Sequence, residues 1–186
     1  MNPSTQEIIQ AFESLPTDRV IILPNNKNII LAAKTAAELT VKKVAVIPSR
    51  SIPQGLAAML RLIPDGDIEA VVEDMNAALG EVETGEITVA TRDVEIDGVD
   101  VQEGQFIALH NGSLVLSEND LERATLGFLE KAQADQYELI TIFYGANIIK
   151  QECMRIADLI REVYPDQEIE IQEGCQPHYF FIISLE

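Results

Sequence analysis

Hydrophobic and polar residues follow the same order twice in the first third of the chain. Short apolar runs at Val20–Leu23 and Val44–Ile47 each precede a polar loop and then a segment with apolar residues at helical spacing. Apolar runs of this length, bounded by charge or proline, are typical of strands buried on both faces. Because buried strands that alternate with helices pair in parallel through right-handed crossovers, this region predicts a parallel βαβα lobe.

Apolar residues at a helical period also locate the helices of this lobe. They predict helices at Glu7–Leu15, after Asn25-Asn26, at Ile52–Leu62 and at Asp67–Leu79. Ser4 and Glu7 have the spacing of a capping box for the first helix. We expect Asn25 or Asn26 to cap the second helix, because asparagine is a favoured N-cap residue.

The pattern changes after Gly85, where apolar and polar residues begin to alternate. It predicts a ribbon over Glu86–Val101 with a turn at Asp97-Gly98, a hairpin of Phe106–Leu109 and Leu114–Leu116 through Asn111-Gly112, helices at Asn119–Gln133 and Ile148–Tyr164, and strands at Leu139–Tyr144, Glu168–Ile171 and Tyr179–Leu185. This half therefore predicts an α/β lobe with a mixed sheet. We place the two lobes at residues 1–82 and 83–186.

Composition and net charge limit the cellular location of the chain and the classes of molecule that it binds. The 186 residues are 47% hydrophobic, contain two cysteines and carry a formal net charge of −18. No apolar run approaches the ~20 residues that span a bilayer, and the N-terminus lacks the regions of a signal peptide. We therefore expect a cytoplasmic chain with no integral membrane segment. The negative charge disfavours nucleic acid and anionic membranes. It would steer a protein partner with a basic patch toward the chain, and the alternative is that the surplus acid only keeps the protein soluble.

The loops after the two N-terminal strands are the candidate binding site. Since loops that follow neighbouring parallel strands meet at one edge of a sheet, we expect these two loops to lie side by side, with Lys27 and Arg50 forming a local basic spot. Free backbone N–H groups at the start of the following helix favour an anion there as well. The ligand is either a small anion or a protein carboxylate. The candidate binding residues are Asn25, Asn26, Lys27, Asn28, Ser49, Arg50, Ser51, Gln54 and Gly55.

Other chemistry has weaker support. Cys175 and His178 have the C-x-x-H spacing of a metal half-site, but the sequence has no second pair at ligand spacing, so we expect no metal site. No Walker A loop, G-x-G-x-x-G or G-x-S-x-G motif occurs, and we assign no catalytic residue. A role for Lys27 as an electrophile or base in an independent enzyme has no support besides the lysine itself.

Several of these stretches also carry a family resemblance. "VIILPNNKNIILAAKTAAEL", "VAVIPSRSIPQGLAAML", "TRDVEIDGVDVQEGQFIAL", "ITIFYGANI" and "GCQPHYFFIISLE" resemble the C-terminal region of the bacterial fatty acid kinase A subunit. This family is also known as YloV, or as DAK-domain proteins of the dihydroxyacetone kinase type. The resemblance runs from Met1 to Glu186 in the same order.

The resemblance implies a DegV-like fold and a non-catalytic module that docks the fatty-acid-binding, DegV-like subunit. In the family, the complex phosphorylates the bound fatty acid to an acyl phosphate and feeds it into lipid metabolism. ATP and Mg²⁺ belong to the kinase domain, which this chain lacks, so we expect no cofactor in the chain itself. The alternative is a domain that holds a fatty acid or a phosphate, which predicts an apolar tunnel opening near Lys27 and Arg50.

The resemblance also bears on the N-terminal lobe. Family members have further strand–helix sequence before the equivalent of Met1, so we expect this lobe to be truncated. Parallel strands that lack a neighbour present edges and apolar faces that pair with other chains. We therefore expect a homo-oligomer.

Overall fold

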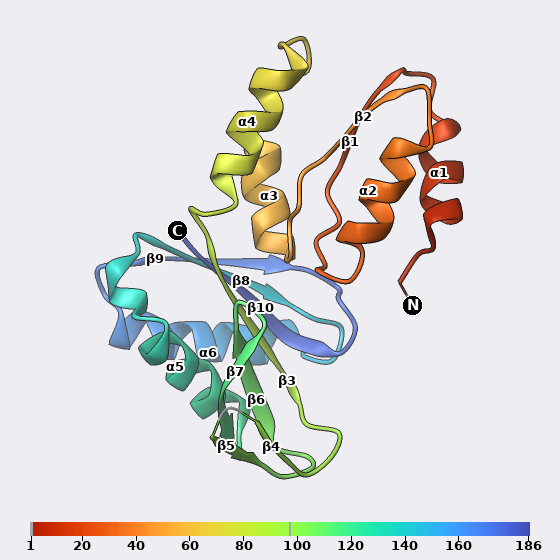
Figure 1. Ribbon diagram of the computed structural model, residues 1–186. Helices are drawn as coiled ribbons and strands as arrows, with labels where there is room; N and C mark the ends of the chain where they lie inside the picture. The colour runs from red at the N-terminus through yellow and green to blue at the C-terminus, as the bar shows by residue number, and fades with distance from the viewer. Residues whose placement is uncertain (1, 97) are drawn as a thin grey trace. The chain divides into compact units, whose positions relative to one another are not determined.

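In the computed structural model, which describes residues 2–96 and 98–186, two short N-terminal strands pair in parallel. They are β1 (Arg19–Ile22) and β2 (Lys43–Val46), and residues 19 to 22 lie opposite residues 43 to 46 (Figure 1). The contacts of the chain divide it into two units, Met1–Val82 and Glu83–Glu186, which we call unit 1 and unit 2. The parallel pairing predicted for the first half is confirmed.

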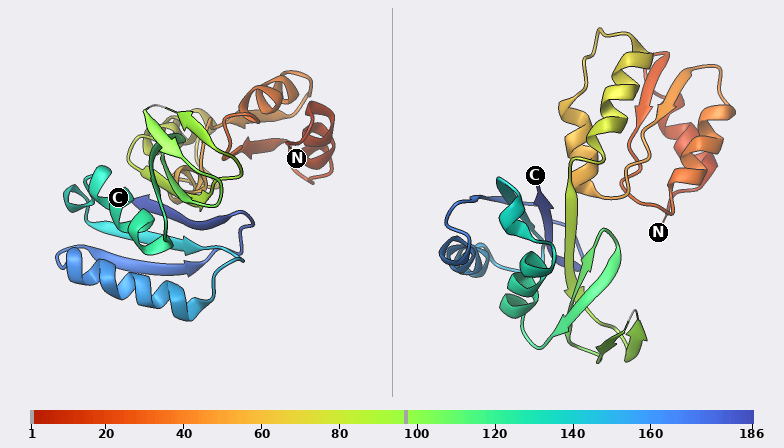
Figure 2. Two further views of the ribbon diagram at one scale, coloured as in Figure 1. Left: turned by 90° about the horizontal axis from the view of Figure 1, so that it is seen from below. Right: turned by 60° about the vertical axis from the view of Figure 1, so that its left-hand side comes forward.

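Helices cover both faces of the strand pair in unit 1. They are α1 (Thr5–Glu13), α2 (Ile30–Glu38), α3 (Ile52–Leu60) and α4 (Ile68–Ala78). On one face Val20 packs with Phe12 of α1 and Ala36 of α2. On the other, Ile47 packs with residues of α3 and α4, including Met75. Figure 2 shows the strands between the two helix pairs.

Side-chain caps begin three of these helices. The Ser4 N–H donates to the Glu7 carboxylate at 2.8 Å, and the Glu7 N–H donates to the Ser4 hydroxyl at 3.3 Å, which confirms the capping box. The bond from the Ser4 backbone holds the pKa of the Glu7 carboxyl below its usual value. The side chains of Ser51 and Asp67 cap α3 and α4 by accepting from the N–H groups of Gln54 and Ala70.

The predicted asparagine cap of α2 is wrong. The helix begins at Ile30, and its N-cap residue is Ile29, which makes no side-chain capping bond. Asn25 and Asn26 lie too early in the chain to reach the first turn of the helix, and their side chains bond within the loop region instead. The strands are also less buried than predicted, since Val20 is the one buried residue of β1 and β2 has none.

Unit 2 contains the larger sheet. Within the described part of this unit, six strands lie in the order β7-β6-β3-β10-β8-β9, and only β8 and β9 pair in parallel. These strands are β3 (Glu83–Val89), β6 (Phe106–His110), β7 (Ser113–Glu118), β8 (Leu139–Tyr144), β9 (Glu168–Glu173) and β10 (Tyr179–Leu185). The mixed sheet predicted for this half is confirmed.

A small ribbon and a tight hairpin account for the alternating segment. Strands β4 (Val94–Ile96) and β5 (Val99–Val101) pair in antiparallel fashion. The predicted turn between them falls partly on Asp97, which lies outside the described residues. The predicted hairpin turn at Asn111-Gly112 is confirmed, because both residues have positive φ angles, 52° and 80°.

Helices α5 (Leu121–Lys131) and α6 (Lys150–Val163) pack with the sheet of unit 2, and the short 3-10 helix η1 (Ala134–Gln136) follows α5. Phe128 of α5 and Ile156 of α6 are fully buried in this core, as are Ile87 and Phe181 of the sheet. The backbone of Gly85 in β3 lies directly against the Phe128 ring, where a side chain would not fit. This close approach explains a glycine in the middle of a central strand.

Candidate functional site

The two loops that follow β1 and β2 are hydrogen-bonded to each other. The Ser49 hydroxyl donates to the Asn25 side-chain oxygen at 2.7 Å and accepts from the Asn25 N–H at 3.0 Å. Ser49 is fully buried, and Asn25 has a φ of 53°, in the left-handed region that asparagine tolerates. The parallel pairing of the strands brings together these residues, which are 24 positions apart in the chain.

Gly55 leaves the space that the Asn25 side chain occupies. A Cβ atom at position 55 would lie 2.1 Å from the Asn25 side-chain oxygen, so any larger residue would displace it. Gly55 is buried within α3, where glycine has a low helix propensity. The choice of glycine is therefore explained by the contact between the first loop and α3.

Five backbone N–H groups of the loops have partners inside unit 1. Those of Asn25, Asn28, Ile29, Arg50 and Gln54 all donate to acceptors within the loops or their flanking residues. These five amides are therefore not available to a small anion, which would have to be bound by other loop amides or by side chains.

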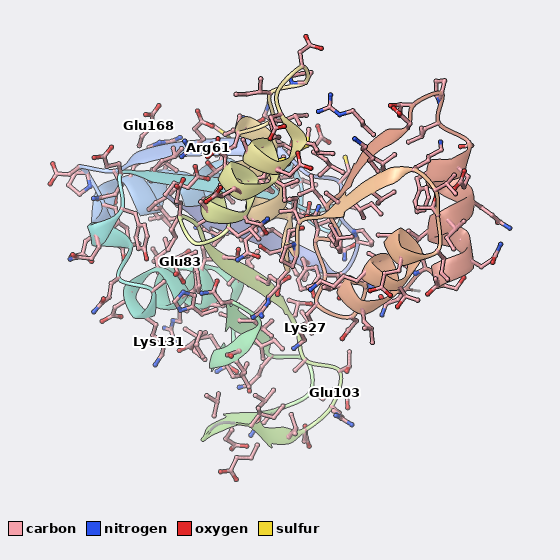
Figure 3. The ribbon with its side chains drawn as sticks, turned by 45° about the horizontal axis from the view of Figure 1, so that its top comes forward. Lys27, Arg61, Glu83, Glu103, Lys131 and Glu168 are labelled. Atoms are coloured by element: carbon pink, nitrogen blue, oxygen red, sulfur yellow. The ribbon has the colours of Figure 1, made fainter. Side chains whose placement is uncertain are left out.

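Lys27 and Arg50 supply the positive charge of these loops. Both side chains are exposed, and Lys27 is labelled in Figure 3. Within residues 2–96 and 98–186, neither forms an ion pair with a carboxylate, whereas Arg61, Arg155 and Arg161 do. The site is therefore a rigid loop pair that carries two exposed cations on a chain of net charge −18.

A further anchor of the second loop could not be recognised from the sequence. The side-chain oxygen of Gln54 accepts from the Arg50 N–H at 2.8 Å, and its amide nitrogen donates to the Leu79 carbonyl at 3.1 Å. Gln54 thus ties the Arg50 loop to the end of α4. No local pattern signals this contact, because Leu79 lies 25 residues away.

The weaker candidates do not gather into a site. Cys175 and His178 are both exposed and both have positive φ angles, 52° and 72°. Among the residues that the structure describes, no group of three or more His, Cys, Asp or Glu side chains could hold a metal ion. The described helices also include none that is long and apolar enough to cross a membrane.

Comparison with known proteins identifies the family. The family of C-terminal regions of fatty acid kinase A-like (FakA-like) subunits matches residues 1–186. The chain belongs to this family. It is 40% identical over 187 residues to protein YloV of Bacillus subtilis and 37% identical over 186 residues to an uncharacterised protein of Staphylococcus epidermidis. It spans 34% of the length of each of these relatives, in which the FakA-like region is therefore one part of a longer protein.

Solved structures show the fold of this FakA-like region. A DegV family protein from Corynebacterium glutamicum superposes with a TM-score of 0.71 at 17% identity, covering 99% of this chain and 83% of that one. The Streptococcus pneumoniae fatty acid kinase B3 protein, solved with linoleic acid, has a TM-score of 0.69 at 14% identity and covers 99% and 76%. The DegV-like fold implied by the resemblance is therefore confirmed.

Proposed function

We propose that this chain is the C-terminal docking module of a fatty acid kinase A subunit. In this proposal it binds a DegV-like subunit that carries the fatty acid, and a separate ATP- and Mg²⁺-binding domain transfers the γ-phosphoryl group of ATP to the fatty acid carboxylate. The products are an acyl phosphate and ADP. The role of the chain itself is to position the DegV-like subunit. Membership of the FakA-like C-terminal family supports this assignment.

The loop pair is the observation that carries the docking role. Five of its backbone N–H groups are bonded internally, and we assign recognition to the exposed side chains of Lys27 and Arg50. Cations on rigid loops fit a carboxylate-bearing protein surface, because little conformational entropy is lost when they bind. The bonds from Ser49 to Asn25 and from Gln54 to Leu79 supply this rigidity.

The alternative function, a fatty acid or phosphate held by this chain, has less support. It predicts an apolar tunnel that opens near Lys27 and Arg50. A cavity of about 310 Å³ in unit 1 has apolar walls, but neither of these residues lines it.

Charge reversal tests the docking role. Lys27→Glu and Arg50→Glu should each cause a loss of tenfold or more, about 1.4 kcal/mol, in the affinity for a fatty-acid-loaded DegV-like subunit. Exposed substitutions typically change stability by less than about 0.5 kcal/mol, so the melting temperature should barely move. Lys34→Glu, on the exposed face of α2, is the matched control because it makes the same charge change away from the loops.

Isothermal titration calorimetry measures the binding, and circular dichroism measures the melting. An equal loss of affinity in Lys34→Glu would show that the loss comes from the change in overall charge and not from the two loops. Unchanged affinity in both loop variants would place the docking surface elsewhere. A separate assay with radiolabelled ATP should detect no phosphoryl transfer by the chain alone, and measurable turnover would overturn the non-catalytic assignment.

A further inference from the structure

A cavity of unit 2 lies beside the last strand of the six-stranded sheet. It has a volume of about 430 Å³ and is lined mainly by residues of α6 and β9, among them Lys150, Met154, Arg161, Ile171 and Glu173. Figure 2 shows α6 lying along β9 at this end of the sheet. Lys150 and Arg161 are about three helical turns apart, which corresponds to about 16 Å. The cavity is therefore a groove long enough for about five residues of extended chain.

The backbone of β9 is open along this groove. The Glu168 N–H donates to the Glu138 carbonyl at 2.9 Å, so Glu168 bonds toward β8. Because alternate residues of a strand direct their peptide groups to opposite edges, Ile169 and Ile171 direct theirs away from β8. Within the described part of unit 2, no strand pairs with that outer edge. The Arg161 guanidinium donates to the Ile169 carbonyl at 3.2 Å, which places its end of the groove at the outer edge and leaves the peptide groups of Ile171 at the centre of the free edge.

The two faces of β9 differ in chemistry. Ile171 is half-buried and packs against the core that contains α6, and Met154, which is 38% exposed, adds apolar surface to the groove. Glu168, Glu170 and Gln172 alternate with the isoleucines and are exposed on the opposite face (Glu168 is labelled in Figure 3). A strand paired with β9 would therefore direct one set of side chains into an apolar groove and the other set beside glutamates.

An extended peptide satisfies the edge and the groove together. Its backbone bonds to the free peptide groups of Ile171 while alternate side chains enter the groove. An aliphatic ligand would leave those peptide groups without partners. A second copy of β9 is disfavoured, because antiparallel self-pairing would bring Glu168 and Glu170 of one copy beside those of the other, and like charges in cross-strand pairs are destabilising.

We propose that the outer edge of β9 and the groove beside α6 bind an extended segment of a partner protein in which basic and apolar residues alternate. The apolar side chains contact Met154 and Ile171, and the basic side chains complement Glu168 and Glu170. The net charge of −18 also steers such a segment toward the chain. This inference does not depend on the proposed docking role of the loops after β1 and β2.

A synthetic peptide, Lys-Val-Lys-Val-Lys-Val-Lys with both ends blocked, tests the site on the 186-residue chain at about 0.15 M salt. Saturating peptide should slow the exchange of the Ile171 amide at least about tenfold, measured by nuclear magnetic resonance. The Gln172 amide, which points toward β8, is the internal reference. The same peptide with glutamate in place of lysine should bind at least about tenfold more weakly by calorimetry. Absence of binding, or binding without protection of Ile171, would overturn the proposal.

Methylation of the peptide backbone distinguishes strand pairing from attraction between charges. A strand bonded along one edge uses the N–H groups of alternate residues only. Two peptides, one N-methylated at its valines and one at its inner lysines, keep the same side chains and the same charge. One of the two should lose at least about tenfold in affinity, and the other should stay within about threefold of the parent peptide. Equal affinities of the two methylated peptides would refute backbone pairing with β9.

Substitutions in α6 and β9 locate the binding surface. Met154→Asp should weaken the peptide at least about tenfold, because an uncompensated carboxylate would lie beneath the bound strand. Val163→Asp is the matched control, since Val163 is an exposed residue of α6 outside the groove lining. Glu170→Lys should also weaken the peptide at least about tenfold, whereas Glu162→Lys, the same charge change at an exposed position of α6 outside the groove, should stay within about twofold.

Three results would assign the edge differently and overturn the proposal. Tighter binding of the glutamate peptide would indicate an acidic segment held by Lys150. Protection of the Ile171 amide that rises with the concentration of the chain, without peptide, would indicate a second copy. Equal effects of each variant and its control would show attraction by overall charge alone. Lys27→Glu should leave the peptide affinity within about twofold, so this proposal and the docking role of the loops are tested separately.

Discussion

Gly55→Ala tests whether the first loop and α3 fit together as the structure shows. The added Cβ would lie 2.1 Å from the side-chain oxygen of Asn25 and 2.7 Å from its Cγ, far inside van der Waals contact. The Asn25 side chain is short and belongs to a residue with a φ of 53°, so it cannot yield by bending at its far end. It must rotate away and give up its bond to Ser49.

The size of the effect follows from two opposing terms. A fully buried hydroxyl that loses its acceptor costs about 1–3 kcal/mol, and Ser49 is fully buried. Alanine in place of glycine within a helix stabilises by about 0.8–1.0 kcal/mol. We therefore expect Gly55→Ala to lower the free energy of unfolding by about 1 kcal/mol.

The Asn25→Gly background should reverse the sign of this effect. Glycine tolerates the positive φ of position 25 and removes the side chain that the new Cβ would meet. Gly55→Ala should then be neutral or stabilising by up to about 1 kcal/mol, because only its helix propensity remains. A double-mutant cycle of the two substitutions measures this reversal.

Urea unfolding provides the assay, but the probe must report on unit 1. The chain has no tryptophan, and its tyrosines, Tyr137, Tyr144, Tyr164 and Tyr179, all lie in unit 2. Hydrogen exchange of peptides from residues 20–60, measured across the urea series, reports on the loops and α3. If Gly55→Ala destabilises both backgrounds equally, the strain does not come from Asn25 and the contact with Asn25 does not explain the glycine.

Two other predictions concern unit 2. Gly85→Ala should destabilise by about 1–3 kcal/mol, since its Cβ would lie 2.3 Å from atoms of the buried Phe128 ring. Tyrosine-monitored urea unfolding measures it against Gly127→Ala, also in unit 2, whose Cβ would lie 2.9 Å from Cδ2 of Leu116, the end of a flexible side chain, and equal effects would refute the packing argument. At pH 8 a thiol reagent should modify the exposed Cys175 and spare Cys153, whose pKa burial raises to about 11, until denaturant is added. Because the unfolded Cys153 thiol ionises first, its contribution to stability is present below pH 9 and is lost as the pH rises toward 11, and Cys153→Ala should remove that loss.

The local pattern of the chain predicted most of the elements. The run Val20–Leu23 corresponds to β1, within one residue at each end, and Leu139–Tyr144 matches β8. The capping box at Ser4 and the turn at Asn111-Gly112 were also predicted correctly. These features depend on residues close together in the chain, so their physical cause is contained in a short stretch of sequence.

The role of the asparagines shows where local pattern is insufficient. Asparagine before a helix is a common N-cap, and this preference favoured Asn25 or Asn26 for α2. In the structure, Asn25 bonds instead to Ser49, which comes from the other loop. The tertiary contact prevails because it pairs a buried hydroxyl that would otherwise lack an acceptor.

The sequence by itself determined the mixed α/β class, the parallel order of the first strands, the family and the positions of the two basic loops. Each of these depends on periodicity, composition or motifs along the chain. Only the tertiary structure decided that Asn25 bonds to Ser49 and that Gln54 bonds to the Leu79 carbonyl, contacts that join residues 24 and 25 positions apart. Both contacts depend on groups that are distant in the chain and meet only when the strands pair and the helices pack on them.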